Sequence, residues 1–144
     1  MNYKTVMILL FVLISFSCKS PMELFQNYQG AKISIGSGGG FSGEYNEYIL
    51  LDNGNLYHKN TLKNETVFLG SVSENEAKQI FKNYFTLNFD DINLNSPGNF
   101  SYYIKFEEND KNHKLIWAKS SEIDPKIKVF YDIFRSKVNA LTRK

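Results

Sequence analysis

Apolar and polar side chains alternate from Phe100 to Glu107, which is the pattern of a strand with one buried face. An Asn- and Asp-rich turn at 109–112 leads into a second apolar segment, Lys114–Ala118, so this region predicts a hairpin. Asn53-Gly54 predicts a type I′ turn within an earlier hairpin. The remaining segments with strand character are Ala31–Ile35, Tyr45–Asp52, Leu56–Lys59 and Thr66–Val72.

Helical spacing replaces this alternation in two places. Ser73 and Glu76 predict a capping box, in which a hydroxyl and a carboxylate bind backbone N–H groups of the first turn. Apolar residues then recur on one helical face: Ala77, Ile80, Phe81, Tyr84 and Phe85. Asp124-Pro125 predicts the start of a second helix, with the Asp as N-cap. Its expected inner face comprises Ile127, Phe130, Phe134, Val138 and Leu141.

These elements predict an α+β fold, an antiparallel sheet of five to six strands in hairpins with two amphipathic helices on one face. The polar stretch Leu87–Gly98 is expected to be a loop. Neither an internal repeat nor a second domain is apparent, so residues 31–144 are expected to form one domain.

The N-terminal residues follow a different pattern, that of an export signal. Lys4 precedes nine unbroken apolar residues, Val6–Ile14, and Ser15 and Ser17 place small side chains just before the sole cysteine, Cys18. A membrane-spanning helix needs about 20 apolar residues, so this segment is too short to be one.

Residues 1–18 resemble bacterial lipoprotein signals, which end on a cysteine that receives a diacylglycerol before cleavage in front of it. The resemblance implies lipidation of Cys18 and a cell-envelope protein held on the extracytoplasmic side of a membrane. Ordinary secretory cleavage, which would release a soluble protein beginning at Cys18, and a buried N-terminal helix are the alternatives. The expected organisation is a signal peptide at 1–17, a lipid-anchored tether at 18–30 and the domain at 31–144.

Charge and cysteine content limit the classes of partner and the ways in which the domain can be stabilised. Lys4 is the only charged residue among 1–17, so the exported chain is close to neutral and nucleic acid is not an expected partner. With its sole cysteine at the anchor, the domain has no disulfide and depends on packing, for which aromatic residues make up 15% of the chain. We expect a monomer without a cofactor.

The glycine-rich run Gly36–Gly43 contains a G-x-G-x-x-G match at Gly38–Gly43. A dinucleotide site requires a helix after this motif, whereas a strand pattern follows here. The run is therefore expected to be a flexible connection. Phe41 within it is expected to be either an exposed contact residue or a core residue that closes the sheet.

Catalytic and metal-binding patterns are weak. His58 and His113 each lie beside a predicted hairpin turn, where surface roles are expected, and neither has a partner at zinc-ligand spacing. Asp90-Asp91 suggests a cation loop, but the positions that an EF-hand reserves for Gly and Glu are Asn95 and Ser101. We therefore predict no metal site, no catalytic residue and no enzyme, with a hydrolase that uses acidic residues as an alternative.

An aromatic cluster is expected where Trp117 lies across from Tyr102-Tyr103 in the predicted hairpin. Such a cluster is either part of the core or a platform on which a sugar ring stacks. Its place opposite two amphipathic helices favours the core.

The order of features is similar to that of the emfourin-type proteins, small inhibitors of protealysin and other thermolysin-like metallopeptidases. The similarity rests on Gly39-Gly40-Phe41-Ser42-Gly43 after a first strand, the capped helix, the Tyr102-Tyr103 hairpin and the Pro125 helix. It implies occlusion of a protease cleft without a cleavable bond.

The predicted function is a lipid-anchored, non-enzymatic binding module of the cell envelope, with an extracytoplasmic protease as the specific candidate partner. A structural envelope lipoprotein without a specific ligand is the alternative. The expected partner-binding residues are Gly39, Gly40, Phe41, Gly43 and Tyr45, because exposed aromatic side chains dominate interface energies.

Overall fold

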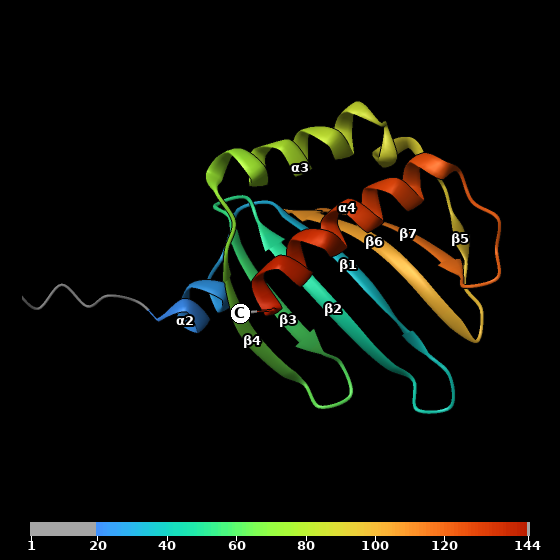
Figure 1. The fold of residues 1–144 in the computed structure, drawn as a ribbon, viewed down its shortest axis with the longest axis horizontal. Coiled ribbons are helices and arrows are strands. Elements are labelled where there is room, and N and C mark those ends of the chain that lie inside the picture. The colour runs from blue at the N-terminus through green and yellow to red at the C-terminus, as the bar shows by residue number, and fades with distance from the viewer. Residues whose placement is uncertain (1–19, 144) are drawn as a thin grey trace, which may run out of the picture.

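The computed structural model describes residues 20–143 (Figure 1). Its helices and strands follow in this order: α2 (Pro21–Gln26), β1 (Lys32–Gly39), β2 (Glu44–Leu51), β3 (Asn55–Asn60), β4 (Glu65–Ser71), α3 (Glu74–Thr86), the 3-10 helix η1 (Phe89–Asp91), β5 (Asn95–Ser96), β6 (Phe100–Glu108), β7 (Lys111–Ala118) and α4 (Pro125–Thr142). The predicted signal peptide, 1–17, and the predicted lipidation site, Cys18, lie outside the described residues.

All seven strands form one mixed sheet in the order β4-β3-β2-β1-β6-β7-β5. Neighbours pair antiparallel, except that β5 pairs parallel to β7. The α+β class is therefore confirmed, while the expectation of five to six antiparallel strands is only approximately right. The additional strand, β5, lies in the predicted loop, where backbone bonds such as Ile116 N–H to the Leu94 carbonyl (2.8 Å) hold a polar segment to β7.

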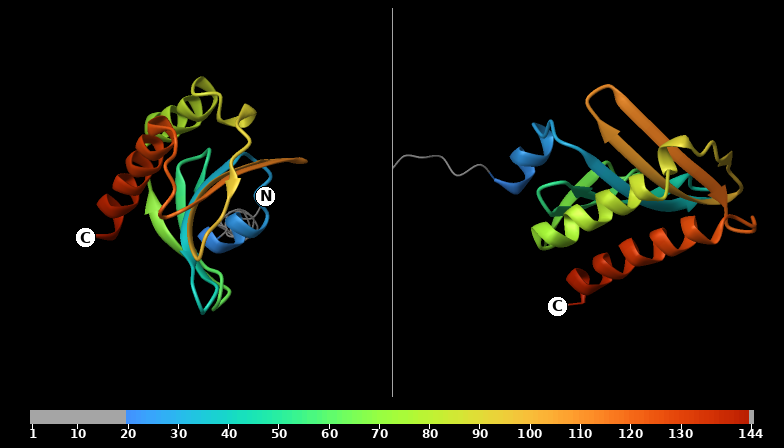
Figure 2. Two further views of the ribbon diagram at one scale, coloured as in Figure 1. Left: turned by 90° about the vertical axis from the view of Figure 1, so that its right-hand side faces the viewer. Right: turned by 90° about the horizontal axis from the view of Figure 1, so that it is seen from above.

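The main core lies between the sheet and the helices α3 and α4, which cover one face (Figure 2). Tyr84 of α3 is at its centre, with ring centroids 5.3 Å from Phe106 and 5.6 Å from Phe89. The predicted helix starts are confirmed: the Ser73–Glu76 capping box is complete, and Asp124 accepts a hydrogen bond from Lys126 N–H at 2.9 Å.

Strand β1 continues through the glycines that were expected to end it. Gly36 lies opposite Tyr103 of β6, and a β-carbon at this position would overlap the tyrosine ring. A β-carbon on Gly38 would overlap the backbone of Glu44 in the same way. Glycine is therefore needed for close approach within the strand rather than for flexibility.

The turn between β2 and β3 differs from the predicted type I′. Three residues separate Leu51 from Asn55, and of the Asn-Gly pair only Gly54 has a positive φ, 91°. This is the pattern of a three-residue hairpin loop that ends in a left-handed glycine. The hairpin itself is confirmed.

Residues 20–30, which were predicted to belong to a tether, include helix α2, and α2 packs on the face of the sheet opposite α3 and α4 (Figure 2). The rings of Phe25 and Tyr57 lie 4.6 Å apart, and the Tyr57 hydroxyl donates a hydrogen bond to the Pro21 carbonyl at 2.7 Å. Tyr28 bonds the Asp52 carboxylate. Ser20 caps the helix, so this part of the chain is attached to the domain. None of the helices within residues 20–143 combines the length and the apolar character that a membrane crossing requires.

Candidate functional site

The tip of the β1–β2 hairpin is an ordered turn of glycines. Gly39, Gly40 and Gly43 have φ of 113°, 73° and 64°, which other residues adopt only with strain. Gly40 N–H donates to the Asn99 carbonyl at 2.5 Å, and Gly43 N–H donates to the Gly40 carbonyl at 3.2 Å. The tip is therefore a built turn and not a loose connection.

Phe41 projects from this tip and is fully exposed, with a relative exposure of 110%. The alternative in which Phe41 closes the core is therefore wrong. Tyr45 differs from it: the side chain is half-buried, and its ring packs 5.9 Å from that of Tyr103 on the sheet. The structure thus brings Gly39, Gly40, Phe41 and Gly43 together at the tip, whereas Tyr45 lies opposite Gly38 with its side chain packed on the sheet.

A second exposed aromatic residue lies beside the tip. Phe100 begins β6 directly opposite Gly39 of β1 and is 40% exposed. Its ring meets that of Tyr102 edge to face at 5.5 Å, and the Lys119 ammonium lies 5.9 Å from its centroid. Phe100 therefore connects the tip to the residues behind it.

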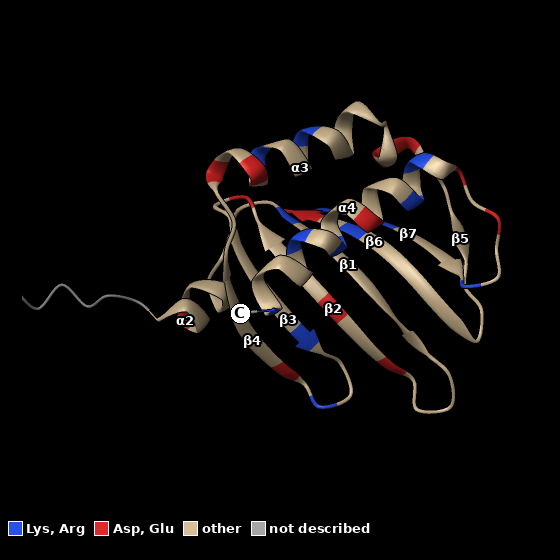
Figure 3. Ribbon diagram, in the orientation of Figure 1, with Lys and Arg blue, Asp and Glu red and all other residues tan. Residues whose placement is uncertain are grey.

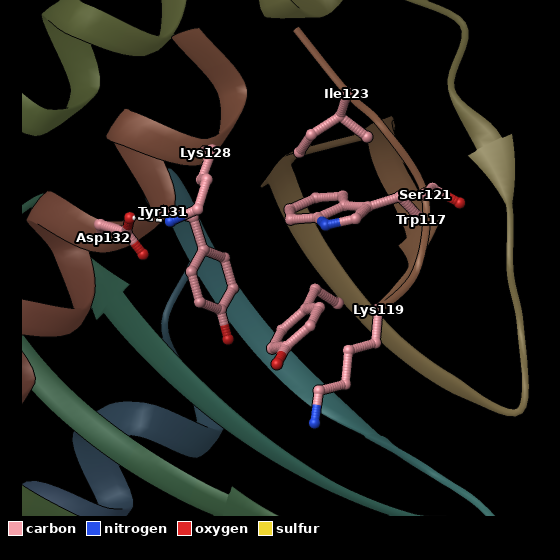
Figure 4. Close-up of a pocket in the computed structure, with 8 residues that line it drawn as sticks. Trp117, Lys119, Ser121, Ile123, Lys128, Tyr131 and Asp132 are labelled. Atoms are coloured by element: carbon pink, nitrogen blue, oxygen red, sulfur yellow. Dashed lines mark hydrogen bonds and ion pairs between the residues drawn. The ribbon is translucent and has the colours of Figure 1, made fainter. Parts of the chain in front are cut away.

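Those residues form a cleft of about 310 Å³, which we call the aromatic cleft (Figure 4). Strands β6 and β7 supply Tyr102 and Trp117, which pair across the hairpin as predicted, and α4 supplies Tyr131. The ring centroids of Trp117 and Tyr131 are 5.7 Å apart, and those of Tyr102 and Tyr131 are 5.5 Å apart. The complete lining is Tyr102, Trp117, Lys119, Ser121, Ile123, Lys128, Tyr131 and Asp132.

The aromatic cleft is lined by two basic residues and one acidic residue. Lys128 and Asp132 form an ion pair of 2.5 Å, the only polar contact drawn among the lining side chains in Figure 4. Within the described part of the chain, Lys119 has no carboxylate at ion-pair distance. Burial raises the pKa of Tyr131, whose hydroxyl donates to the Gly36 carbonyl at 3.4 Å. The cleft therefore presents apolar walls, a neutral tyrosine and one net positive charge.

The sequence patterns indicated the Tyr102–Trp117 pair but missed the cleft. Tyr131 was absent from the expected inner face of the last helix, although it follows Phe130 and is itself 8% exposed. The signal that could have found the cleft is the group of three large aromatic residues near the start of that helix. The other wall of the cleft comes from the loop 119–124, whose sequence has no periodic pattern.

The histidines are not surface turn residues, in contrast to the prediction. His58 is half-buried in β3, stacked on Tyr48 at 4.9 Å, where burial lowers its pKa. His113 in β7 bonds the Tyr84 hydroxyl at 2.8 Å and the Ile92 carbonyl at 3.0 Å. One nitrogen of His113 therefore holds α3 through Tyr84, and the other holds the segment after α3 through Ile92.

The acidic residues do not converge with these histidines. Asp90 and Asp91 lie exposed on η1. Nowhere in residues 20–143 do three His, Cys, Asp or Glu side chains lie close enough together to hold a metal ion. Acidic and basic residues are interspersed over the molecule, while the β1–β2 tip carries neither (Figure 3).

A polar cluster covers part of the sheet face opposite α3 and α4, and we call it the open-face cluster: Glu47, Tyr103, Lys105 and Lys114. Lys105 Nζ lies 2.9 Å from Glu47 Oε1 and forms an ion pair with it. Burial alone would lower the pKa of Lys105, but Glu47 and Glu107 raise it. Burial, and then the Glu47 carboxylate, raise the pKa of Tyr103. Lys114 Nζ lies 4.1 Å from the centre of the Tyr103 ring, so the cluster is closed by its own side chains.

Comparison with models of known protein families finds no match, and comparison with curated proteins finds none either. The similarity to emfourin-type inhibitors and to lipoprotein signals therefore stays a prediction from the motifs. The geometry alone identifies the edge formed by Phe41, Phe100 and the aromatic cleft as the candidate site.

Proposed function

We propose that this protein is a non-enzymatic binding module, held in the cell envelope by lipid on Cys18, that binds a protein partner through its β1–β2 tip. The observation that carries the proposal is the full exposure of Phe41 on a turn fixed by backbone hydrogen bonds. Burying an exposed phenylalanine side chain in a partner is worth about 1.5–3 kcal/mol. Because the turn is already ordered, little of that gain is lost to immobilising it.

The positions of helix α2 and the β1–β2 tip at opposite ends of the sheet support this role. Helix α2 begins three residues after Cys18, and Figure 1 shows it at the end of the sheet away from the β1–β2 tip. A strand of 8 residues, the length of β1, spans roughly 26 Å at about 3.3 Å per residue. A lipid on Cys18 would therefore leave Phe41 directed away from the membrane.

Inhibition of an extracytoplasmic protease is the specific form of this proposal. Proteases cleave extended segments, whereas the backbone at Gly40 and Gly43 is left-handed and tightly turned. The tip could thus fill a cleft with Phe41 without offering a bond for cleavage. A standard interface needs about 800 Å² from each partner, so the proposal requires the adjoining edge to bind together with the tip.

Photocrosslinking in the native cell tests the binding role. A benzoylphenylalanine at position 41 is expected to give one discrete protein adduct, and the same group at position 62 is not. Leu62 is the matched control because it is 61% exposed at the neighbouring β3–β4 tip. Adducts that are absent, or identical at both positions, would contradict the proposal and favour a structural lipoprotein. Loss of thermolysin inhibition on Phe41→Ala tests the protease form separately.

The intact mass of the protein from the membrane fraction tests the anchor. A chain that begins at Cys18 and carries diacylglyceryl and acyl groups is expected, and Cys18→Ser should abolish the modification. An unmodified chain that begins at Cys18 would make this a soluble secreted protein.

A further inference from the structure

We propose that the aromatic cleft binds the C-terminal aromatic residue of a polypeptide, with its ring packed against Tyr102, Trp117 and Tyr131 and its terminal carboxylate at Lys119. The inference deepens the proposed function and rests on it for the protein nature of the partner. Its argument uses the size, ring geometry and charge of the cleft.

The size of the cleft limits what can enter. Its volume, about 310 Å³, is at the lower end of the range of about 300–1,000 Å³ for ligand pockets. One amino-acid residue fits such a space, whereas an oligosaccharide or a folded segment does not. Ile123 and the three aromatic side chains make the walls apolar, which favours an apolar side chain over a polar one.

Ring geometry favours an aromatic ligand over a sugar. A sugar stacks on an open ring face, but Trp117 and Tyr131 are only 5% and 8% exposed. These two rings already meet edge to face, at an interplanar angle of 82°, and a third ring can join such a cluster in the same way. Ring edges carry the positive part of the aromatic quadrupole and attract the negative face of another aromatic ring.

The charge of the cleft favours a ligand with one carboxylate. Asp132 neutralises Lys128, whereas Lys119 has no carboxylate partner among residues 20–143. The backbone of Lys119 is fixed, since its N–H donates to the Phe100 carbonyl at 2.9 Å. A terminal carboxylate at the rim would complete an ion pair with Lys119 at the point where the cleft opens toward Phe100. The preceding residues of the peptide would then run over Phe100 toward Phe41.

The experiment uses Trp117, the only tryptophan of the chain, as the reporter. The full-length protein is titrated with N-acetyl-L-phenylalanine and with its amide, and with glucuronic acid as a sugar of the same charge. Binding is followed by tryptophan fluorescence and by the indole N–H resonance. We expect a saturable change with the carboxylate and an affinity about tenfold lower for the amide.

Two variants and one control variant localise the effect. Lys119→Gln is expected to reduce the carboxylate-to-amide preference to near one, while Lys63→Gln, at the exposed β3–β4 turn, should preserve it. Ser121→Phe, which fills the cleft from its rim, should abolish binding of both ligands. Equal affinity for acid and amide, tighter binding of glucuronic acid, or no saturable change in either signal would overturn the inference.

These outcomes are separable from those of the crosslinking experiment. Crosslinking at position 41 without ligand binding at Trp117 would retain the proposed function and remove only the cleft inference. Ligand binding without crosslinking would leave a small-carboxylate site and remove the protein-binding role of the tip.

Discussion

Single residues show how the sheet is stabilised on the face opposite α3 and α4, which no long helix of the described residues covers. Gly36 lies in one row between Glu47 of β2 and Tyr103 of β6. Because Gly36 has no side chain, the Tyr103 ring can lie across it, and Glu47 keeps only 5% exposure beside that ring. Packing on this face therefore requires glycine at position 36, because a β-carbon there would occupy the space of the Tyr103 ring.

Gly36→Ala is expected to destabilise the protein by about 1–3 kcal/mol, the usual cost of overpacking, because the methyl group would overlap the Tyr103 ring. Urea unfolding followed by tryptophan fluorescence measures the loss. In a Tyr103→Ala background the same substitution should cost little, and an unchanged cost there would contradict the steric explanation. Ser34→Ala is the control in the same strand: its buried hydroxyl has no hydrogen-bond partner in the described residues, so its removal should be neutral or stabilising.

Lys105→Met is expected to destabilise the protein by roughly 2–3 kcal/mol, since it leaves the Glu47 carboxylate buried without its ion-pair partner. The loss is below that of a fully buried pair because 21% of the Lys105 side chain is exposed. The double variant Glu47→Gln/Lys105→Met should recover more than half of it. Additive losses in this double-mutant cycle would show that the two residues are not coupled.

At the level of elements, prediction succeeded where the determinants were local. The capping box at Ser73, the N-cap at Asp124 and the alternation in β6 depend on neighbouring residues, and all three were predictable. The continuation of β1 through Gly36 was not, because the space is filled by Tyr103 from a distant part of the chain. Helix α2 and strand β5 were missed since six and two residues are too short to show a period.

The same reasoning applies to the candidate site. The aromatic pair across the β6–β7 hairpin was predictable from strand register, whereas the ordered glycine turn was not, because composition alone indicated a flexible connection. The exposure of Phe41 was left open because neither periodicity nor turn chemistry decides whether the end of a hairpin folds back onto a core.

Glu76 links the start of α3 to α4, and its ionisation should make stability depend on pH. Hydrogen bonds from Lys137 and then Ser73 lower its pKa from the usual 4.5 to about 2. A carboxyl whose pKa is lowered by folding stabilises the protein above pH 4.5 and loses that contribution as the pH falls toward about 2. Glu76→Gln should therefore show a smaller decrease in Tm between pH 5 and pH 2 than the unaltered protein.

The control for this measurement is Glu122→Gln, in the exposed loop before α4, which should retain the full decrease. An unchanged pH dependence in Glu76→Gln would mean that the Lys137 contact does not persist in solution.

At the scale of the whole molecule, the sheet separates two unequal layers. Within residues 20–143, one face carries α3, α4 and the main core, and the other carries α2 over a small apolar group around Tyr57. Since α2 has six residues, its helical bonds alone do not stabilise it, and its structure depends on contact with the sheet.

Phe25→Ala is therefore expected to release α2 while leaving the main core folded. Hydrogen exchange should show it: the Leu24 and Asn27 amides, which donate to Ser20 and Glu23 carbonyls, should exchange about tenfold faster or more. Amides of the central strand β1 should be unaffected. Leu24→Ala removes a more exposed side chain, 38%, from the same helix and should have little effect. Faster exchange throughout β1 would instead show that α2 and the core unfold together.

The two edges of the sheet end differently, and this matters for self-association. Beyond β7, the two residues of β5 pair only with Ile116 and Trp117, so most of the outer edge of β7 has no strand beside it among residues 20–143. The opposite edge strand, β4, has an irregular register against Leu56–Tyr57, and Gly70 within it has a φ of 136°. Irregular edges resist the addition of strands from other molecules. We therefore expect concentrated protein to resist strand addition at β4, although Val67 on that strand is 52% exposed.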